Sequence, residues 1–518
     1  MNINSPQALR SFYRPSSESP VVDPNPALPE GAKARVEFDG EVARAYLDSF
    51  DWRFWNRGEI LELVEGEGRR MLELRPVGEG SPRAQQDVAA VPRMAVDLGF
   101  GAIGHMLGDV LDVRALLFAR RLRSRVRRWA FRDAEGKTVL RMEWRQDRAG
   151  RSTFPVLIRF EPLRGYDKKA FQWARSLIRE LGLTAVHEEP LVVATQRTRR
   201  RPGDYDGKLN VALEPDMRMD AALRTLLSSL LETMSANEAG SIGRWDIEFV
   251  HDYRVAVRRA RSLLSAIKGV LPETRQRQFS DGLRRLQDVT GDPRDLDVYL
   301  LDFDHFATRL SAKDMRALEP FRGFLAERHG EAYEALRVAL RSGAYTGFMD
   351  SARGYLRSPL PKSSSLPNAL RPVGEVADER IWKTYRWVLK HGRAITPRSP
   401  NDDLHDVRKR CKRLRYLLEA FRGLYPPAQI NGLIKALKRL QEVLGDFQDR
   451  EVQYTTIHRY EDEMRSAGVL TSRTEKAMER LAEGFHHEQG EIRKDFYARF
   501  EAFASEDNAR RFQGLFKS

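Results

Sequence analysis

The sequence HDYRVAVRRAR occupies residues 251–261, and the sequence HDVRKRCKRLR occupies residues 405–415. In both segments a histidine is followed by basic residues at offsets 3, 7, 8 and 10. Forty positions after each histidine comes a second shared pair, Gly291-Asp292 in the first copy and Gly445-Asp446 in the second. Such agreement between distant segments identifies two copies of one unit.

Each copy has the residue spacing of an amphipathic helix. At about 100° per residue, the histidine and three of the basic residues fall on one face roughly 80° wide, opposite an apolar face. We call these two faces the basic stripes: His251, Arg254, Arg258 and Arg261 in the first copy, and His405, Arg408, Lys412 and Arg415 in the second. Like charges at this spacing repel by a few tenths of a kcal/mol per pair. The stripes therefore predict a bound anion, with acids on neighbouring helices as the alternative source of neutralisation.

The composition favours a polyanionic partner. The chain has 518 residues and a formal net charge of +14 at pH 7, which favours nucleic acid, inorganic polyphosphate or an acidic membrane surface. Its one cysteine, Cys411, excludes a disulfide within the chain and a cysteine-based zinc site, and predicts a cytoplasmic setting. No uncharged apolar run is long enough to predict a membrane span.

The chain divides by sequence character into a strand-rich part and a helical part. Proline and serine dominate the first 31 residues, where we expect a disordered arm. The predicted order is an arm at 1–31, an α+β domain at 32–205, a linker at 206–215 and an all-α domain at 216–510, with halves at about 216–357 and 373–510.

Hydrophobic periodicity predicts the elements of both domains. In the first domain we expect strands at 35–38, 60–65, 70–75, 126–132, 138–145 and 156–161, and a helix at 168–181. In the second we expect helices at 220–234, 246–270, 281–290, 295–310, 316–340, 346–356, 378–391, 403–424, 428–444, 450–467 and 472–500.

The repeated segments, with Leu286-Gln287 and Leu440-Gln441 before each Gly-Asp pair, resemble the CHAD family, the conserved histidine α-helical domain. The resemblance implies a bundle of two similar halves around a basic channel. It also implies binding of long inorganic polyphosphate, often at polyphosphate granules, without an enzymatic activity of the domain itself. The implied polyphosphate-binding residues are His251, Arg254, Arg258, Arg259, Arg261, Arg284, Arg285, His405, Arg408, Lys412, Arg413, Arg415, Lys435, Lys438 and Arg439.

The strand-rich domain resembles the CYTH family of triphosphate tunnel metalloenzymes, through residues 46–53 and 160–166. That family opens with Glu-x-Glu-x-Lys, which supplies paired carboxylates for metal-dependent triphosphate cleavage. This chain has one acid at residues 34–38 and one at 158–161, a poor donor set for Mg²⁺ or Mn²⁺. We therefore predict a CYTH-like β-barrel that has lost catalysis and holds no metal or other cofactor.

The sequence thus predicts a cytoplasmic, non-enzymatic polyphosphate-binding protein at polyphosphate granules. We expect tighter binding at pH 6 than at pH 8 where the two stripe histidines contact phosphate. One alternative is a metal-dependent triphosphatase activity of the CYTH-like domain. Another is RNA or DNA binding by the basic stripes, against which stands their lack of interleaved aromatic residues other than Tyr416.

Overall fold

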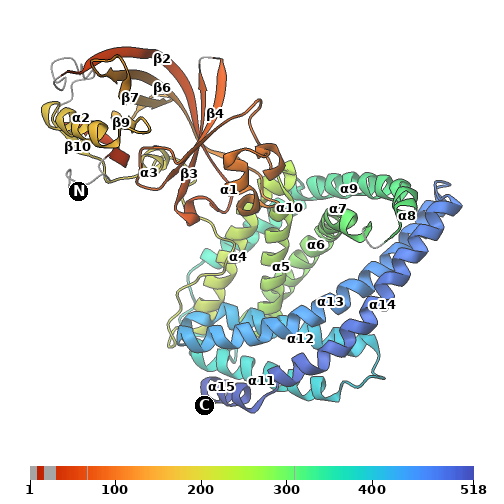
Figure 1. The fold of residues 1–518 in the computed structure, drawn as a ribbon. Coiled ribbons are helices and arrows are strands. Elements are labelled where there is room, and N and C mark those ends of the chain that lie inside the picture. The colour runs from red at the N-terminus through yellow and green to blue at the C-terminus, as the bar shows by residue number, and fades with distance from the viewer. Residues whose placement is uncertain (1–8, 17–30, 67, 308–309, 518) are drawn as a thin grey trace. The chain divides into compact units, whose positions relative to one another are not determined.

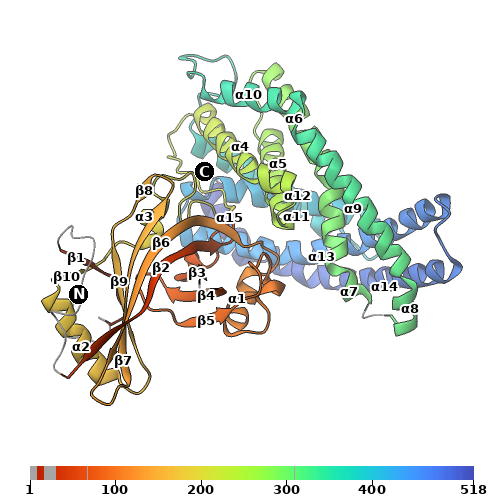
Figure 2. The same cartoon turned by 90° about the horizontal axis from the view of Figure 1, so that it is seen from above.

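The computed structural model describes residues 9–16, 31–66, 68–307 and 310–517. The chain folds into two compact units, residues 1–207 and residues 208–518. The first unit is rich in strands and the second is helical (Figures 1 and 2). The α+β fold class predicted from the sequence is therefore confirmed.

One antiparallel sheet organises the first unit, with the strand order β10-β1-β9-β7-β6-β2-β3-β4-β5 and β8 paired to β7. The long central strands β2 and β6 pair along most of their length and carry bulges, which bend a sheet. The strands are β1 Tyr13–Pro15, β2 Lys33–Asp48, β3 Glu59–Gly66, β4 Arg69–Pro76, β5 Ala84–Asp87, β6 Leu117–Arg132, β7 Thr138–Ala149, β8 Ser152–Thr153, β9 Leu157–Pro162 and β10 Leu183–Ala185.

The two faces of this sheet differ because side chains alternate along each strand. On one face, Leu61, Leu63 and Leu72 pack with helix α1 (Ala102–Leu111). A second apolar cluster on β6, β7 and β9 packs with helix α2 (Asp167–Glu180). The alternate positions of the same strands carry charged side chains that are nevertheless buried, including Glu62 and Glu73.

The predicted disordered arm is wrong for residues 9–16. Strand β1 pairs with β10, with Tyr13 opposite Ala185, and Tyr13 also lies opposite Ile158 of β9. Phe12 and Tyr13 are buried, so apolar burial inside a segment rich in proline and serine orders this part of the chain. Residues 1–8 and 17–30 of the predicted arm lie outside the described residues.

Each helix predicted in the second unit lies on an observed helix, although several boundaries differ. Residues 308–309, at the end of one predicted helix, lie outside the described part of the chain. The helices are α4 Met219–Gly243, α5 Ile247–Ala266, α6 Glu273–Val289, α7 Gly291–Ala307, α8 Ala312–Ala317, α9 Glu319–Leu340, α10 Gly343–Arg357, α11 Val373–Ala394, α12 Asn401–Ala420, α13 Pro427–Ser466, α14 Ser472–Phe503 and α15 Glu506–Phe516. Short α3 (Pro190–Thr195) belongs to the first unit.

The main helical core includes side chains of α4, α5, α11 and α12, and a second cluster joins α7, α9, α13 and α14. The segment predicted as a linker at 206–215 contributes to the main core, because Leu209 and Leu213 are buried in it. These residues therefore anchor the start of the helical unit rather than forming a loose tether.

The two Gly-Asp pairs, both expected to be turns, differ in structure. In the first copy α6 ends at Val289 and α7 begins at Gly291. In the second copy α13 continues without a break through Gly445, so the prediction of two separate helices there is wrong. The residue after the pair explains the difference: Pro293 lacks the N–H that a continuing helix needs, whereas Phe447 supplies it and is buried.

Candidate anion-binding site

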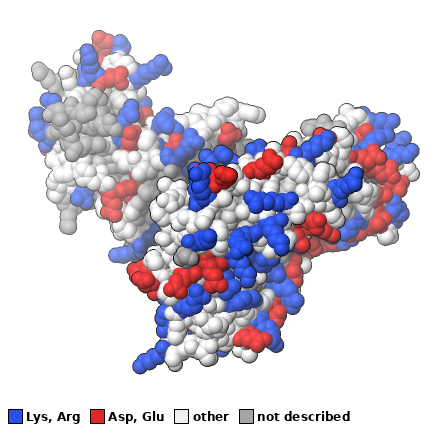
Figure 3. Space-filling model, turned by 90° about the horizontal axis from the view of Figure 1, so that it is seen from below, with Lys and Arg blue, Asp and Glu red and all other residues white. Residues whose placement is uncertain are grey.

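The structure brings the two basic stripes to one cavity of the helical unit. Helices α5 and α12 are joined by an ion pair of 3.3 Å between Arg259 and Glu419. A cavity of about 620 Å³ lies beside them. Its lining includes His251, Arg254 and Arg258 from α5 and His405, Arg408 and Lys412 from α12. Lys and Arg side chains also gather on the face of the molecule seen in Figure 3, beside Asp and Glu.

Arg258 and Lys412 occupy equivalent positions, seven residues after the histidine of each copy. Both are half-buried and both line the cavity. Among the described residues neither has a hydrogen-bond or ion-pair partner, and the Nε atom of Arg258 is buried without an acceptor. Two adjacent desolvated cations without an acceptor are unfavourable in an empty cavity. They are the strongest local attraction for an anion.

The cations on either side of this central pair have partners within the protein. Arg254 donates from Nη1 to the backbone oxygen of Gln287 at 2.7 Å. Arg408 lies 3.4 Å from a carboxylate oxygen of Asp449. Further along the helices, Arg259 and Arg415 both pair with Glu419, at 3.3 Å and 3.4 Å.

The crowding of positive charge changes proton affinity in the cavity. Burial and then the neighbouring Arg408 and Arg258 lower the pKa of Lys412 to about 7. Burial also lowers the pKa of Arg408, which Asp449 partly offsets. An anion placed between these groups would reverse the effect, since it favours the charged form of each.

Both stripe histidines contact polar side chains at the cavity. The Nδ1 atom of His405 is hydrogen-bonded to Oε1 of Gln448. Potential ligand atoms of His251, Glu248 and Asp252 lie within 4.8 Å of one another at the start of α5. These three residue types are able to hold a divalent cation.

Sequence reasoning assigned no role to the other charged residues of this cavity. Acids line its wall, most of them exposed, and further arginines come from α7 and α13. The unassigned residues are Asp292, Arg294, Asp295, Asp302, Asp446, Asp449, Arg450 and Arg459. Two of the acid pairs carried a signal, because Asp292 and Asp295 repeat as Asp446 and Asp449 in the second copy.

The remaining predicted binding residues lie outside the cavity lining. Arg413 donates to the hydroxyl of Ser265 at 2.9 Å, and Arg284 pairs with Asp281 at 3.3 Å. Lys435, Lys438 and Arg439 are exposed on α13. The full set outside the lining is Arg259, Arg261, Arg284, Arg285, Arg413, Arg415, Lys435, Lys438 and Arg439.

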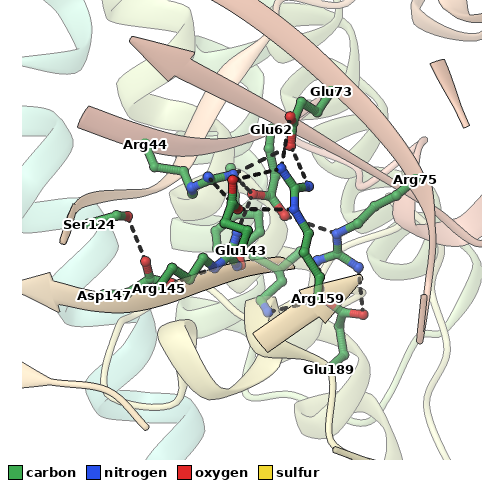
Figure 4. A network of polar contacts seen from close by, with 12 residues as sticks. Arg44, Glu62, Glu73, Arg75, Ser124, Glu143, Arg145, Asp147, Arg159 and Glu189 are labelled. Atoms are coloured by element: carbon green, nitrogen blue, oxygen red, sulfur yellow. Dashed lines mark hydrogen bonds and ion pairs between the residues drawn. The ribbon is translucent and has the colours of Figure 1, made fainter. Parts of the chain in front are cut away.

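The first unit contains a second charged constellation, a buried network of four arginines and five carboxylates (Figure 4). Glu62 accepts from Arg44 at 2.8 Å, from Arg75 at 2.9 Å and from Arg145 at 3.1 Å. Arg159 joins Glu73 at 2.9 Å to Glu143 at 3.0 Å. We call this set the arginine–carboxylate network: Arg44, Glu62, Glu73, Arg75, Glu143, Arg145, Asp147, Arg159 and Glu189.

The network was not predicted, because the expected carboxylates were sought at residues 34–38 and 158–161. Its acids instead stand singly on β3, β4 and β7, each flanked by apolar residues that point the other way. Burial alone would raise the pKa of Glu62, but Arg145, Arg75 and Arg44 together hold it well below its ordinary value. The carboxylates are thus charged and already occupied by guanidinium groups.

Comparison with known proteins places the helical unit. Residues 225–458 match the CHAD domain family, so this part of the chain is a CHAD domain. Over 207 residues the chain is 28% identical to an uncharacterized protein of Mycobacterium tuberculosis, covering 39% of this chain and 38% of that one. The chain therefore matches only about two-fifths of the length of that curated relative.

Two solved structures show similarity to separate parts of the chain. The CHAD domain from the plant Ricinus communis has 24% identity and a TM-score of 0.48, covering 57% of this chain and 96% of its own. A Hippeastrum protein described as having a dominant triphosphatase activity has 14% identity and a TM-score of 0.27, covering 38% of this chain and 98% of its own. The antiparallel, β-rich first unit fits the CYTH-like fold expected from the sequence. None of the described helices combines the length and apolar character that crossing a membrane requires.

Proposed function

We propose that the CHAD domain of this chain binds inorganic polyphosphate in the cavity beside α5 and α12. The observation that supports this most directly is the central pair, Arg258 and Lys412, which lines the cavity without a partner among the described residues. Phosphate oxygens would supply the missing acceptors. An arginine fork takes two such oxygens at once, and a lysine ammonium acts as a mobile point charge.

A flexible polyanion suits the cavity better than a single anion. Cations continue from the central pair to Arg254 and Arg408 on the same lining, so successive charges of a linear polymer meet successive cations. Binding of this kind weakens steeply with salt, because counterions released from the polymer supply much of the free energy.

The aromatic residues of the cavity favour polyphosphate over nucleic acid. Tyr299 and Tyr460 line the cavity but are each only 6% exposed. The hydroxyl of Tyr299 donates to the backbone oxygen of Gln453 at 3.1 Å. Buried rings of this kind are poor platforms for stacking bases, which single-stranded nucleic-acid sites commonly use.

We further propose that the first unit is not catalytic. In the arginine–carboxylate network, a metal ion would have to displace guanidinium groups that already hold Glu62, Glu73 and Glu143. The whole protein should release no phosphate from tripolyphosphate with Mg²⁺ or Mn²⁺. Phosphate release that Glu62→Gln abolishes would contradict this proposal.

The same function places the protein in the cytoplasm at polyphosphate granules. A fluorescent fusion of the whole chain should co-localise with the granules in cells that accumulate polyphosphate. Diffuse fluorescence in cells with visible granules would contradict the location and leave the binding chemistry untouched.

The binding test removes the central pair. Arg258→Glu combined with Lys412→Glu should abolish binding of long-chain polyphosphate while circular dichroism stays unchanged, because both side chains already lack partners. The matched control is Lys313→Glu with Arg316→Glu, which makes the same charge change on exposed positions of α8.

Isothermal titration at two salt concentrations reads out both variants, with tripolyphosphate and single-stranded RNA as competing ligands. The control should bind polyphosphate like the wild type. Full binding by the central-pair variant, or equal affinity of the wild type for RNA, would overturn the assignment.

A further inference from the structure

Helix α11 carries a third run of basic residues, which the repeat does not contain. Lys383, Arg386, Lys390 and Arg393 follow one another at intervals of three or four residues. At about 100° per residue they share a face roughly 80° wide, and they extend along about 15 Å of helix. We call this set the outer stripe.

The outer stripe is solvent-exposed and lacks internal neutralisation. All four side chains are exposed. Within the described part of the chain, none of them forms an ion pair or a hydrogen bond. The acid nearest to them on the same face, Glu379, already pairs with Arg371 at 3.0 Å. A structural helix surface ordinarily interleaves acids with such a run, so the outer stripe keeps its full positive charge.

Basic residues of α12 connect the outer stripe with the cavity. Lys409, Arg410 and Arg413 follow one another around α12 from the face that carries Lys412 toward α11. The Arg410 guanidinium lies over the ring of Trp387 on α11, 4.5 Å from its centroid. Lys409 has one acidic neighbour, Asp406, at 3.3 Å. A cationic surface therefore leads from Lys412 across α12 onto α11.

We propose that the outer stripe binds the length of a polyphosphate chain that extends beyond the cavity. This inference rests on the proposed function, and it adds that the protein is selective for long chains. A cavity of about 620 Å³ encloses only a short length of polymer. A longer polymer must leave it, and the continuous cationic surface of α12 and α11 offers the next contacts.

The aromatic residues on α11 argue for a polymer without bases. The ring of Trp387 is stacked on His391, with 3.7 Å between centroids, and also contacts Arg410. Trp382 packs against Tyr385 and the helical core. Both indole rings are thus engaged inside the protein, and the outer stripe offers charge without a stacking platform.

The test removes the four charges of the outer stripe from the full-length protein. The variant combines Lys383→Gln, Arg386→Gln, Lys390→Gln and Arg393→Gln. The matched control combines Lys313→Gln, Arg316→Gln, Arg473→Gln and Lys476→Gln, which removes four exposed charges from α8 and α14 that likewise lack ion pairs among the described residues. Affinity is measured by titration with polyphosphate of about ten phosphates and of several hundred phosphates.

We expect the outer-stripe variant to bind the short polymer like the wild type and the long polymer roughly tenfold more weakly. Its salt slope for the long polymer should fall by up to about three, at about 0.7 per lost contact with a flexible single strand. The control should keep the wild-type preference for long chains.

Other outcomes separate this inference from the function on which it rests. Equal binding of the long polymer by wild type and outer-stripe variant, or an equal loss in the control, would overturn the outer stripe alone. A loss confined to RNA binding would make it a nucleic-acid surface and would also overturn the inference. Failure of the wild type to bind either polymer would overturn both proposals.

Discussion

At the scale of single residues, the central pair differs in one respect that the repeat does not require. The first copy has arginine at position 258, and the second has lysine at position 412. Arginine stays charged at any physiological pH, whereas a desolvated lysine among cations loses its proton readily. One half of the site therefore has a fixed charge and the other half has a charge that depends on pH.

Polyphosphate binding should take up a proton at Lys412. The empty cavity lowers the pKa of this residue to about 7, so at pH 8 most of it is neutral. A bound polyanion raises the pKa again, and affinity should increase as the pH falls from 8 toward 7. Titration calorimetry at pH 8 in two buffers of different ionisation enthalpy should give an uptake approaching one proton per site.

Lys412→Arg provides the control for this proton uptake. Arginine keeps the positive charge at pH 8, so the variant should still bind polyphosphate while the uptake largely disappears. Unchanged uptake in the variant would assign the proton to other groups of the cavity, such as His251 and His405.

Some of the cavity residues could be predicted from sequence and others could not. Arg258 and Lys412 stood out because two helices repeat the same basic spacing. Arg294 and Arg459 line the same cavity from α7 and α13, and their place depends on how those helices pack. Periodicity within one helix identifies a face but not the partner of that face.

At the scale of elements, α13 shows how one residue decides between a turn and a continuous helix. Both copies place glycine and aspartate forty residues after the histidine, which reads as a turn signal in each. Pro293 ends that similarity in the first copy, and the buried Phe447 continues the helical pattern in the second. Local pattern therefore predicted where the helices lie better than where they end.

Gly445→Ala should stabilise the protein by about 0.5–1 kcal/mol, because alanine is favoured over glycine inside a helix. A Cβ atom at this position would meet nothing within 4 Å. The change in unfolding free energy from urea denaturation measures the effect. A turn at Gly445 would instead give a loss of stability.

Gly392→Ala is the matched contrast within α11. There a Cβ atom would fall 2.0 Å from the ring of Phe500, so the same substitution should destabilise the helical unit. Opposite signs for the two variants would confirm that the glycines play different roles, one tolerated and one required by close packing.

At the scale of the whole molecule, the two units hold their charges in opposite ways. The helical unit leaves its central cations without partners, whereas the first unit pairs every arginine of its buried network with a carboxylate. The network escaped prediction because acids alternating with apolar residues are typical of a solvent-facing strand side. In this sheet the charged side is buried as well.

Glu62→Gln should destabilise the first unit by about 3–5 kcal/mol, since it removes a buried charge that Arg44, Arg75 and Arg145 share. Differential scanning calorimetry of the whole protein measures the loss. Glu65→Gln, on the same strand but at a half-exposed position, is the matched control and should change stability much less.

The same network predicts acid sensitivity. The folded pKa values of Glu62 and Glu73 lie below their ordinary value of 4.5, despite burial, because of the surrounding arginines. Their contribution to stability is fully present above about pH 4.5 and is lost as the pH falls through the folded values. Calorimetric scans from pH 7 to pH 3 should show the transition of the first unit falling steeply below pH 4.5. A transition independent of pH in this range would contradict that assignment.

The repeated helices α5 and α12 have a consequence for the direction of the ligand. A linear phosphate polymer is identical when read from either end, unlike RNA, whose two directions are chemically distinct. Two copies of one cation spacing, differing at the centre only as Arg258 differs from Lys412, present nearly the same contacts to a chain entering either way. The polymer can therefore engage, shift by one phosphate or reverse without losing register, which makes the site a bearing rather than a ratchet.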